Sequence, residues 1–358
     1  MDYWTTRSDK IFEEPIPNDP YFKSVYDFAK AWLQGQKTFL LTTSGSTGTP
    51  KEIALNREQM IASAHLTGQA LDLPQGTRAL VCLNVNYIAG IMMLVRGLEL
   101  DWQLTIVNPG SNPLLDVPEA VCFDFVALVP LQLTAILRDE STRGRVGDLG
   151  KILLGGAPLS EILSREVRGL KIPVYQSYGM TETVSHVALR RVNGPASQEN
   201  FQVLPGVEFG VDDRGCLYLR GAVTNKERLQ TNDLVTITSP NSFYWLGRAD
   251  SVINSGGVKI SLDKMDQMVG KVLQEMEQIA DYFSWHEPDE TLGQKLVLFL
   301  EGSHSFLGVE TLLEKISDRA KRYETPKAVY FVENFIRTPT AKIDKSATAQ
   351  YHFNPAHD

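Results

Sequence analysis

The chain contains little cysteine, no excess of positive charge and no long apolar run. Its three cysteines, Cys82, Cys122 and Cys216, lie far apart among 358 residues, each within an apolar stretch. This spacing matches neither a metal site nor a disulfide framework, so we expect small core residues in a reducing compartment. The net charge of −8 argues against a nucleic-acid-binding surface, which normally carries a basic excess.

Targeting and membrane signals are also missing from the sequence. Residues 1–7 contain no apolar signal core, and the most apolar windows, such as 89–95, are far shorter than the ~20 residues of a membrane helix. The sequence therefore predicts a cytoplasmic protein that does not enter a membrane. Its length predicts roughly two to three domains.

The chain does contain a loop in which hydroxyl and glycine residues alternate. Residues 41–53 read Leu-Thr-Thr-Ser-Gly-Ser-Thr-Gly-Thr-Pro-Lys-Glu-Ile, directly after an apolar run that predicts a strand. Glycines allow the backbone N–H groups to point inward, and hydroxyls and a lysine add donors, which suits a polyphosphate. The spacing is not that of a Walker A loop, and the loop alone leaves a plain Ser/Gly-rich surface turn open. The candidate phosphate ligands are Thr43, Ser44, Gly45, Ser46, Thr47, Gly48 and Lys51.

Short β-rich runs alternate with helical segments between residues 37 and 178. This alternation predicts an α/β fold with a mostly parallel sheet that is covered on both faces. Ligands bind beyond the carboxyl ends of such strands, so the loops at 43–51, 155–158 and 177–182 are expected to converge on one site. The expected strands are 78–85, 103–107, 125–129, 151–154 and 174–176, and the expected helices are 88–100, 131–138 and 160–170.

The last third of the chain has a different character. Short alternating strands at about 200–247 predict a small β-subdomain. After Asp250 a compact α+β pattern follows, with helices expected at 262–278 and 309–323. We therefore predict an N-terminal domain over 1–249 and a small C-terminal domain over 250–358.

Six motifs occur in a familiar order. They are Thr-Ser-Gly-Ser-Thr-Gly-Thr-Pro-Lys (43–51), Tyr-Gly-Met-Thr-Glu (178–182), Gly-Cys-Leu-Tyr-Leu-Arg-Gly (215–221), Asn-Asp-Leu-Val (232–235), Gly-Arg-Ala-Asp-Ser-Val-Ile (247–253) and Thr-Pro-Thr-Ala-Lys-Ile-Asp-Lys (338–345). In this order they closely resemble the adenylate-forming superfamily of acyl-CoA synthetases, peptide-synthetase adenylation domains and luciferases, from about residue 39 to 346. The resemblance implies a mobile C-terminal lid that swings about a hinge at Asp250.

The resemblance also implies ATP, Mg²⁺ and CoA as cofactors. A carboxylate would attack the α-phosphorus to give acyl-AMP and pyrophosphate, and a thiol would then release AMP. Lys342 would be the catalytic lysine, and Glu182 would hold Mg²⁺. The structural alternatives are that Lys342 is a solvent-exposed charge and that Glu182 is an acidic residue at the start of a helix. The remaining implied positions are Thr181 at phosphate, Tyr178 and Gly179 at adenine, Asp233 and Arg248 at ribose, Gly156 and Ala157 in the ATP site, and Gly256 and Gly257 at CoA.

Three positions depart from the family pattern. Tyr87 stands where histidine is common, Ala341 replaces the glycine before Lys342, and Asn232 replaces the glycine before Asp233. Asparagine still tolerates a left-handed backbone, so we expect activity to survive these changes.

The acid substrate is the least defined part of the prediction. The short chain and the motifs at 87–96 and 181–186 resemble the compact o-succinylbenzoate–CoA ligases of menaquinone biosynthesis. That acid has a second carboxylate, for which Arg96 is the candidate partner, with Ser185 and His186 as helpers and Tyr87 and Gly155 as pocket walls. Four alternatives stay open. Arg96 could be a charge on a helix surface, the substrate could be another acid, the acceptor could be a carrier protein, and the protein could bind a nucleotide without catalysis. By analogy with relatives, a homodimer is possible.

Overall fold

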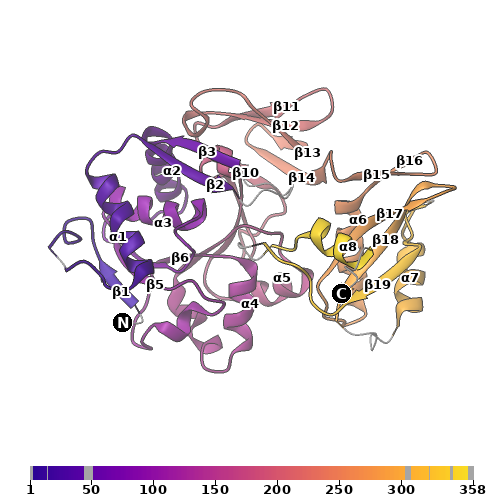
Figure 1. Ribbon diagram of the computed structural model, residues 1–358, viewed down its shortest axis with the longest axis horizontal. Coiled ribbons are helices and arrows are strands. Elements are labelled where there is room, and N and C mark those ends of the chain that lie inside the picture. Colours follow the sequence, from indigo (N-terminus) through magenta and orange to yellow (C-terminus); the bar gives the residue numbers. More distant parts are fainter. Residues whose placement is uncertain are drawn as a thin grey trace.

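One long sheet organises most of the molecule (Figure 1). The computed structural model describes residues 3–13, 15–43, 51–302, 308–321, 323–338 and 342–353. Its twelve-stranded sheet has the order β1-β5-β4-β6-β7-β8-β9-β10-β14-β13-β12-β11. The strands are β1 (Tyr3–Thr6), β4 (Arg78–Val81), β5 (Gln103–Val107), β6 (Phe125–Leu128), β7 (Lys151–Leu154), β8 (Val174–Gly179), β9 (His186–Arg191), β10 (Phe201–Val203), β11 (Glu208–Val211), β12 (Cys216–Arg220), β13 (Leu229–Ser239) and β14 (Ser242–Arg248).

The predicted α/β class is confirmed, and the sheet changes direction in its middle. Strands β5, β4, β6, β7 and β8 pair in parallel, as expected. From β8 onward each neighbour is antiparallel, beginning with β9. The strands expected in a separate β-subdomain are therefore hydrogen-bonded into the same sheet as the parallel half.

Helices cover both faces of the parallel half. The helices of this part are α1 (Pro20–Leu33), α2 (Arg57–Ala70), α3 (Ile88–Glu99), α4 (Pro130–Arg138) and α5 (Glu161–Arg168). In β4, Ala79 and Val81 join the core cluster under α1 to α3, whereas Leu80 joins the cluster under α4 and α5. Because successive side chains of a strand point to opposite faces, this division requires burial on both sides.

The glycine loop belongs to a small separate sheet. Strands β2 (Thr38–Thr43) and β3 (Lys51–Asn56) pair only with each other, with Thr43 opposite Lys51. Strand β2, which precedes the loop in the chain, thus belongs to the two-stranded sheet and is not one of the parallel strands of the main sheet; residues 44–50 lie outside the described residues.

The C-terminal part contains a second sheet. Strands β15 (Val252–Ser255), β16 (Val258–Ser261), β17 (Tyr282–Asp289), β18 (Gly293–Glu301) and β19 (Ala328–Val332) form it. Helices α6 (Leu262–Glu275) and α7 (Val309–Ser317) pack on Leu296 and Leu298, while α8 (Lys345–Phe353) lies on the face of Val297 and Phe299. This part has its own core clusters, which begin at Ile253.

The cysteine prediction is partly wrong. All three cysteines are free, and Cys82 and Cys216 are buried, but Cys122 is exposed. It lies in the turn between the Pro118–Val121 hydrogen bond and β6, where the chain has not yet entered the sheet. Within the described ranges no helix is long and apolar enough to cross a membrane.

Gly150 gives a stability test of this fold. Its φ is +62°, and a Cβ there would lie 2.4 Å from the Asp124 carbonyl oxygen, so Gly150→Ala should cost about 2 kcal/mol or more of unfolding free energy. Gly147→Ala is the control, because a Cβ there meets nothing within 4 Å. Urea unfolding measures both, and equal stability of the two variants would contradict the constraint.

Candidate functional site

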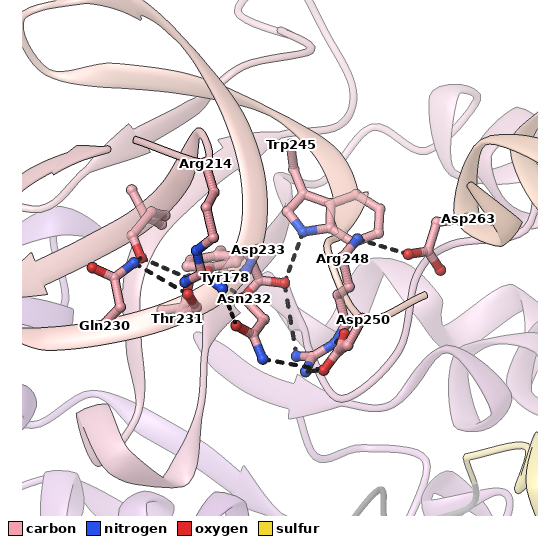
Figure 2. Close-up of polar contacts among 11 residues, drawn as sticks. Tyr178, Arg214, Gln230, Thr231, Asn232, Asp233, Trp245, Arg248, Asp250 and Asp263 are labelled. Atoms are coloured by element: carbon pink, nitrogen blue, oxygen red, sulfur yellow. Dashed lines mark hydrogen bonds and ion pairs between the residues drawn. The ribbon is translucent and has the colours of Figure 1, made fainter. Parts of the chain in front are cut away.

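A buried carboxylate, Asp233, is the centre of one polar cluster (Figure 2). The Tyr178 hydroxyl donates to its Oδ2 at 2.7 Å, and the Trp245 indole N–H donates to its Oδ1 at 3.2 Å. Arg248 Nη1 lies 3.9 Å from the same Oδ1, and the Thr231 hydroxyl accepts from the Asp233 backbone N–H. Three residues predicted to bind the nucleotide, Tyr178, Asp233 and Arg248, thus meet at the Asp233 carboxylate.

Tyr178 presents an aromatic face at this carboxylate. Its ring centroid lies 5.2 Å from that of Phe243 and 5.8 Å from that of Phe201. Burial, followed by the negative charge of Asp233, raises the pKa of Tyr178. The phenol therefore stays protonated and can go on donating to Asp233.

The predicted hinge residue Asp250 is tied to the same cluster. Arg248 donates from Nε and Nη2 to its two carboxylate oxygens at 2.8 and 2.6 Å, which lowers the pKa of Asp250. Asn232 Nδ2 donates to Asp250 Oδ2 at 3.3 Å. The backbone N–H of Arg248 donates to Asp263 in the first turn of α6 at 2.8 Å. Asn232, one of the departures from the family pattern, thus has a structural partner in Asp250, the predicted hinge residue (Figure 2).

The segment after β8 is folded tightly against β9. Thr181 and Glu182 lie in a 3₁₀ turn (Thr181–Thr183), with Glu182 exposed. Val184 then has φ +67° and ψ −50°, and the Ser185 N–H bonds to the Thr183 carbonyl at 2.7 Å. This is a γ-turn of the rare, strained hand, and a residue held in such a conformation suggests a functional constraint.

Gly179 joins the adenine side of the site to the predicted acid pocket. A Cβ at Gly179 would lie 2.3 Å from the Ser185 carbonyl oxygen and 2.5 Å from His186 Cα. Only glycine allows this approach of the two backbones. The Tyr178–Glu182 motif and the Ser185–His186 pair are therefore direct neighbours.

Arg96 is buried, with 3% of its surface exposed, and lies beside Ser185 and His186. Its Nη2 donates to Ser185 Oγ at 2.5 Å and its Nε to Thr67 Oγ1 at 3.0 Å. His186 lies between the two hydroxyls, 3.2 Å from Ser185 Oγ and 3.3 Å from Thr67 Oγ1. The alternative of a helix-surface charge for Arg96 is wrong, because α3 turns this side chain into the core.

Burial changes the pKa values of the two basic side chains in this cluster, Arg96 and His186. Burial lowers the pKa of Arg96 to about 9, and burial followed by the Arg96 charge lowers that of His186 well below its usual range. His186 is therefore neutral. Among the described residues no carboxylate forms an ion pair with Arg96. A buried cation without a counter-ion is costly, and an anion beside Arg96 would reduce that cost.

Lys342 reaches the site from the C-terminal part of the chain. Its Cε lies 3.9 Å from the position that a Cβ on Gly156 would occupy, and desolvation lowers its pKa. Gly155 and Gly156 follow β7, and a Cβ on Gly155 would lie 2.9 Å from Ser177 Oγ. Ala157 comes next and is half-buried. Lys342, the loop after β7 and the motif after β8 therefore form a continuous wall.

Other predicted residues lie elsewhere or outside the described chain. Ser44, Gly45, Ser46, Thr47 and Gly48 lie outside the described residues, and Thr43 and Lys51 are described by their backbone only. Gly256 and Gly257, both with positive φ, form the two-residue turn of the β15–β16 hairpin. In Figure 1 this hairpin lies at the outer edge of the C-terminal part, whereas the yellow segment before α8 reaches toward the main sheet. Tyr87 is half-buried at the start of α3.

Two residues of the site were not predicted from the sequence. Trp245 shares the Asp233 carboxylate with Tyr178, and Thr67 joins Arg96 to His186. Neither belongs to a motif. Both become visible only when the pairing of β13 with β14 and the packing of α2 on α3 are known.

The fold and the site define a nucleotide-binding α/β enzyme whose C-terminal part supplies a lysine. A family model described as AMP-binding enzyme matches residues 12–221. An acyl-CoA synthetase (AMP-forming)/AMP-acid ligase II-like protein from Dyadobacter fermentans is 53% identical, with a TM-score of 0.68, and the match covers 97% of this chain and 99% of that one.

More distant relatives were also found. A 2-succinylbenzoate–CoA ligase of Lactococcus lactis is 24% identical over 94% of this chain and 78% of its own length. The o-succinylbenzoate CoA synthetase of Bacillus subtilis, solved with ATP and magnesium, has a TM-score of 0.69 at 22% identity, over 87% of this chain and 69% of that one. At this identity the second likeness shows the fold.

The chain belongs to the AMP-binding enzyme family. This confirms the resemblance to the adenylate-forming superfamily and the predicted class, an AMP-forming ligase of an acid and a thiol.

Trp245→Phe tests the Asp233 cluster. The change keeps an aromatic ring but removes the N–H that orients Asp233, so we expect the KM for ATP to rise about five- to tenfold, the equivalent of about 1 kcal/mol. With 2′,3′-dideoxy-ATP, which has no ribose hydroxyls for Asp233, the two proteins should differ little. Tyr244→Phe, on the neighbouring strand position, is the control. An equal loss with both nucleotides would contradict the assignment.

His186 predicts a specific pH dependence of stability. The pKa of His186 is lower in the folded state than in the unfolded state, so below about pH 6.5 the unfolded state binds a proton that the folded state does not. The unfolding free energy therefore decreases as the pH is lowered. Between pH 7.5 and 5.5 the wild type should lose about 1 kcal/mol more unfolding free energy than His186→Gln, at most about 1.4 kcal/mol per pH unit. Urea unfolding at both pH values measures the difference, and parallel losses would show that His186 titrates normally.

Proposed function

We propose that the protein is an ATP-dependent ligase that joins o-succinylbenzoate to CoA, through o-succinylbenzoyl-AMP. The observation that carries this proposal is Arg96, a buried cation whose described partners are neutral, next to the motif after β8. One carboxylate of the acid would react and the other would pair with Arg96. The relatives named as 2-succinylbenzoate–CoA ligases support this choice of acid.

In the first step the acid carboxylate attacks the α-phosphorus of ATP, and pyrophosphate leaves. Two anions must approach each other, so positioning and charge neutralisation carry the catalysis. Lys342 would bridge the attacking carboxylate and the α-phosphate from its place beside Gly156. Asp233 would accept hydrogen bonds from the ribose hydroxyls, and Tyr178 would stack on adenine. The hydroxyls and amides of 43–51 would hold the β- and γ-phosphates.

The residues of the site fit a magnesium ion that arrives with ATP. The described residues contain no cluster of three or more His, Cys, Asp or Glu side chains that could hold a metal alone. Magnesium commonly uses one or two carboxylates together with substrate phosphates. Glu182, exposed beside Thr181, would supply the carboxylate. When bound, the ion neutralises charge on the phosphates.

In the second step the CoA thiol attacks the acyl carbonyl, and AMP leaves. The β15–β16 hairpin lies at the outer edge of the C-terminal part, whereas the segment before α8 reaches toward the main sheet (Figure 1). The C-terminal part would therefore turn about Asp250 to bring Gly256 and Gly257 to the pantetheine arm. Free cysteines, one of them exposed, support the cytoplasm as the location. A homodimer and the lack of a nucleic-acid partner remain predictions.

A matched pair of acids tests the substrate. 4-Oxo-4-phenylbutanoate is o-succinylbenzoate without the ring carboxylate, so the wild type should use it about 100-fold less well in kcat/KM, the equivalent of about 2 to 3 kcal/mol for a charged hydrogen bond. In Arg96→Met the kcat/KM for o-succinylbenzoate should fall by a similar factor, while that for the mono-acid and the KM for ATP stay nearly constant.

The alternatives make different predictions in the same assay, read as AMP and pyrophosphate release. If another acid yields a thioester and o-succinylbenzoate does not, the substrate proposal is wrong. A carrier-protein phosphopantetheine that outcompetes CoA would replace the acceptor. If no acid yields AMP, a silent nucleotide-binding protein is favoured.

A further inference from the structure

Lys342 lies on a short hairpin at the C-terminal end of the chain. Arg337 pairs with Ile343, the Thr338 N–H donates to the Lys342 carbonyl at 2.8 Å, and the Asp344 N–H donates to the Ile336 carbonyl at 2.8 Å. We call residues 336–344 the lysine hairpin; 339–341 lie outside the described residues. The backbone of Lys342 is thereby fixed to the first strand of this hairpin.

The first strand of the lysine hairpin is held by carboxylates. Arg337 Nη2 lies 2.6 Å from Asp281 Oδ2 and 2.7 Å from Glu301 Oε2. The other oxygen of Glu301 accepts from the Phe335 N–H at 2.6 Å. These contacts fix the entry of the hairpin to the ends of β17 and β18.

The exit of the lysine hairpin is held by a different ion pair. Lys345 is the first residue of α8 and lies three residues after Lys342. Its Nζ donates to Asp266 Oδ2 at 2.6 Å, and the other Asp266 oxygen accepts from the Ser284 N–H at 2.5 Å. Both side chains are mostly covered, with 34% and 21% exposed, so the pair is better shielded from water than an ordinary surface ion pair.

Helix α6 connects this ion pair to the hinge. Asp266 lies on α6 one turn after Asp263, which accepts from the backbone N–H of Arg248. Residues three apart lie on the same face of a helix. Helix α6 therefore contacts the chain next to Asp250 through Asp263 and the exit of the lysine hairpin through Asp266.

We propose that Lys345 and Asp266 are positioning residues that place the Lys342 ammonium in the ATP site. This inference rests on the proposed role of Lys342 in acyl-AMP formation. Catalytic groups must be held within about 0.5 Å of their working position, and a lysine side chain with four rotatable bonds needs a fixed backbone to achieve this. Loss of the ion pair would leave the exit of the hairpin held by the core packing of Ile343 and α8 and by the hydrogen bond from the Ile336 N–H to Thr348 Oγ1.

The experiment compares Lys345→Met with Lys295→Met. Lys295 forms an ion pair with Glu287 in the same part of the chain, with similar exposure, 25% and 26%, and away from the hairpin. We expect Lys345→Met to lower kcat for acyl-AMP formation about tenfold or more, with the KM for ATP within about twofold of wild type. Lys295→Met should keep wild-type rates. Lys345→Arg, which retains the charge, should restore most of the activity.

Two further measurements separate positioning from loss of structure. Thioester formation from supplied o-succinylbenzoyl-AMP and CoA should be nearly normal in Lys345→Met, since Lys342 is not needed there. In the double variant with Lys342→Ala, the Met substitution should add no further loss, because its effect passes through Lys342. Equal losses in both half-reactions, an additive double variant, or a wild-type rate for Lys345→Met would overturn the proposal.

Failure of the proposed function has a separate signature. If Lys342→Ala itself forms acyl-AMP at the wild-type rate, the catalytic role of Lys342 is wrong, and the positioning role falls with it. If Lys342→Ala is impaired and Lys345→Met is not, only the positioning role is wrong.

Discussion

The contact between Gly179 and the Ser185–His186 backbone is the constraint on which the site depends. At this point the sheet passes from parallel to antiparallel pairing. A parallel partner would need a long crossover connection, whereas an antiparallel one returns after a short turn. The turn here holds Thr181 and Glu182 on one side and delivers Ser185 and His186 on the other. The reversal therefore puts residues predicted to bind the nucleotide next to residues predicted to bind the acid.

The two halves of this site manage charge in opposite ways. Asp233 is buried but receives donors from Tyr178 and Trp245, so its charge is satisfied before any ligand binds. Arg96 is buried with hydroxyl partners, and no carboxylate in the described part of the chain forms an ion pair with it. In the first case the protein fixes the geometry of an acceptor. In the second case the described residues leave a buried positive charge without a counter-ion, which the second carboxylate of the proposed acid would supply.

The parallel half of the fold could be predicted because its buried strands are uninterrupted apolar runs. Strands β5 and β7 begin and end where expected. Strand β13, with 11 residues, is longer than the short strands expected at 200–247, since Gln230, Asn232 and Asp233 interrupt its apolar pattern. Segments α1 and β1 were not predicted. Contacts that depend on how strands pair could not be predicted either. Trp245 on β14 contacts Asp233 on β13, and the pairing of these two strands shifts after Leu234. The motif residues could be named as candidates because their spacing is local, whereas the partners that contact them were missed because those come from other elements.

The exposure of Cys122, unexpected from the sequence, has an experimental use. Since Cys82 and Cys216 are buried, a thiol-reactive dye at neutral pH would modify one position in the folded protein. That position lies ahead of β6, in the part of the chain that carries the main sheet. A second cysteine introduced on the outer hairpin of the C-terminal part would then give a donor–acceptor pair, with which the proposed rotation of one part against the other could be looked for in single molecules during turnover.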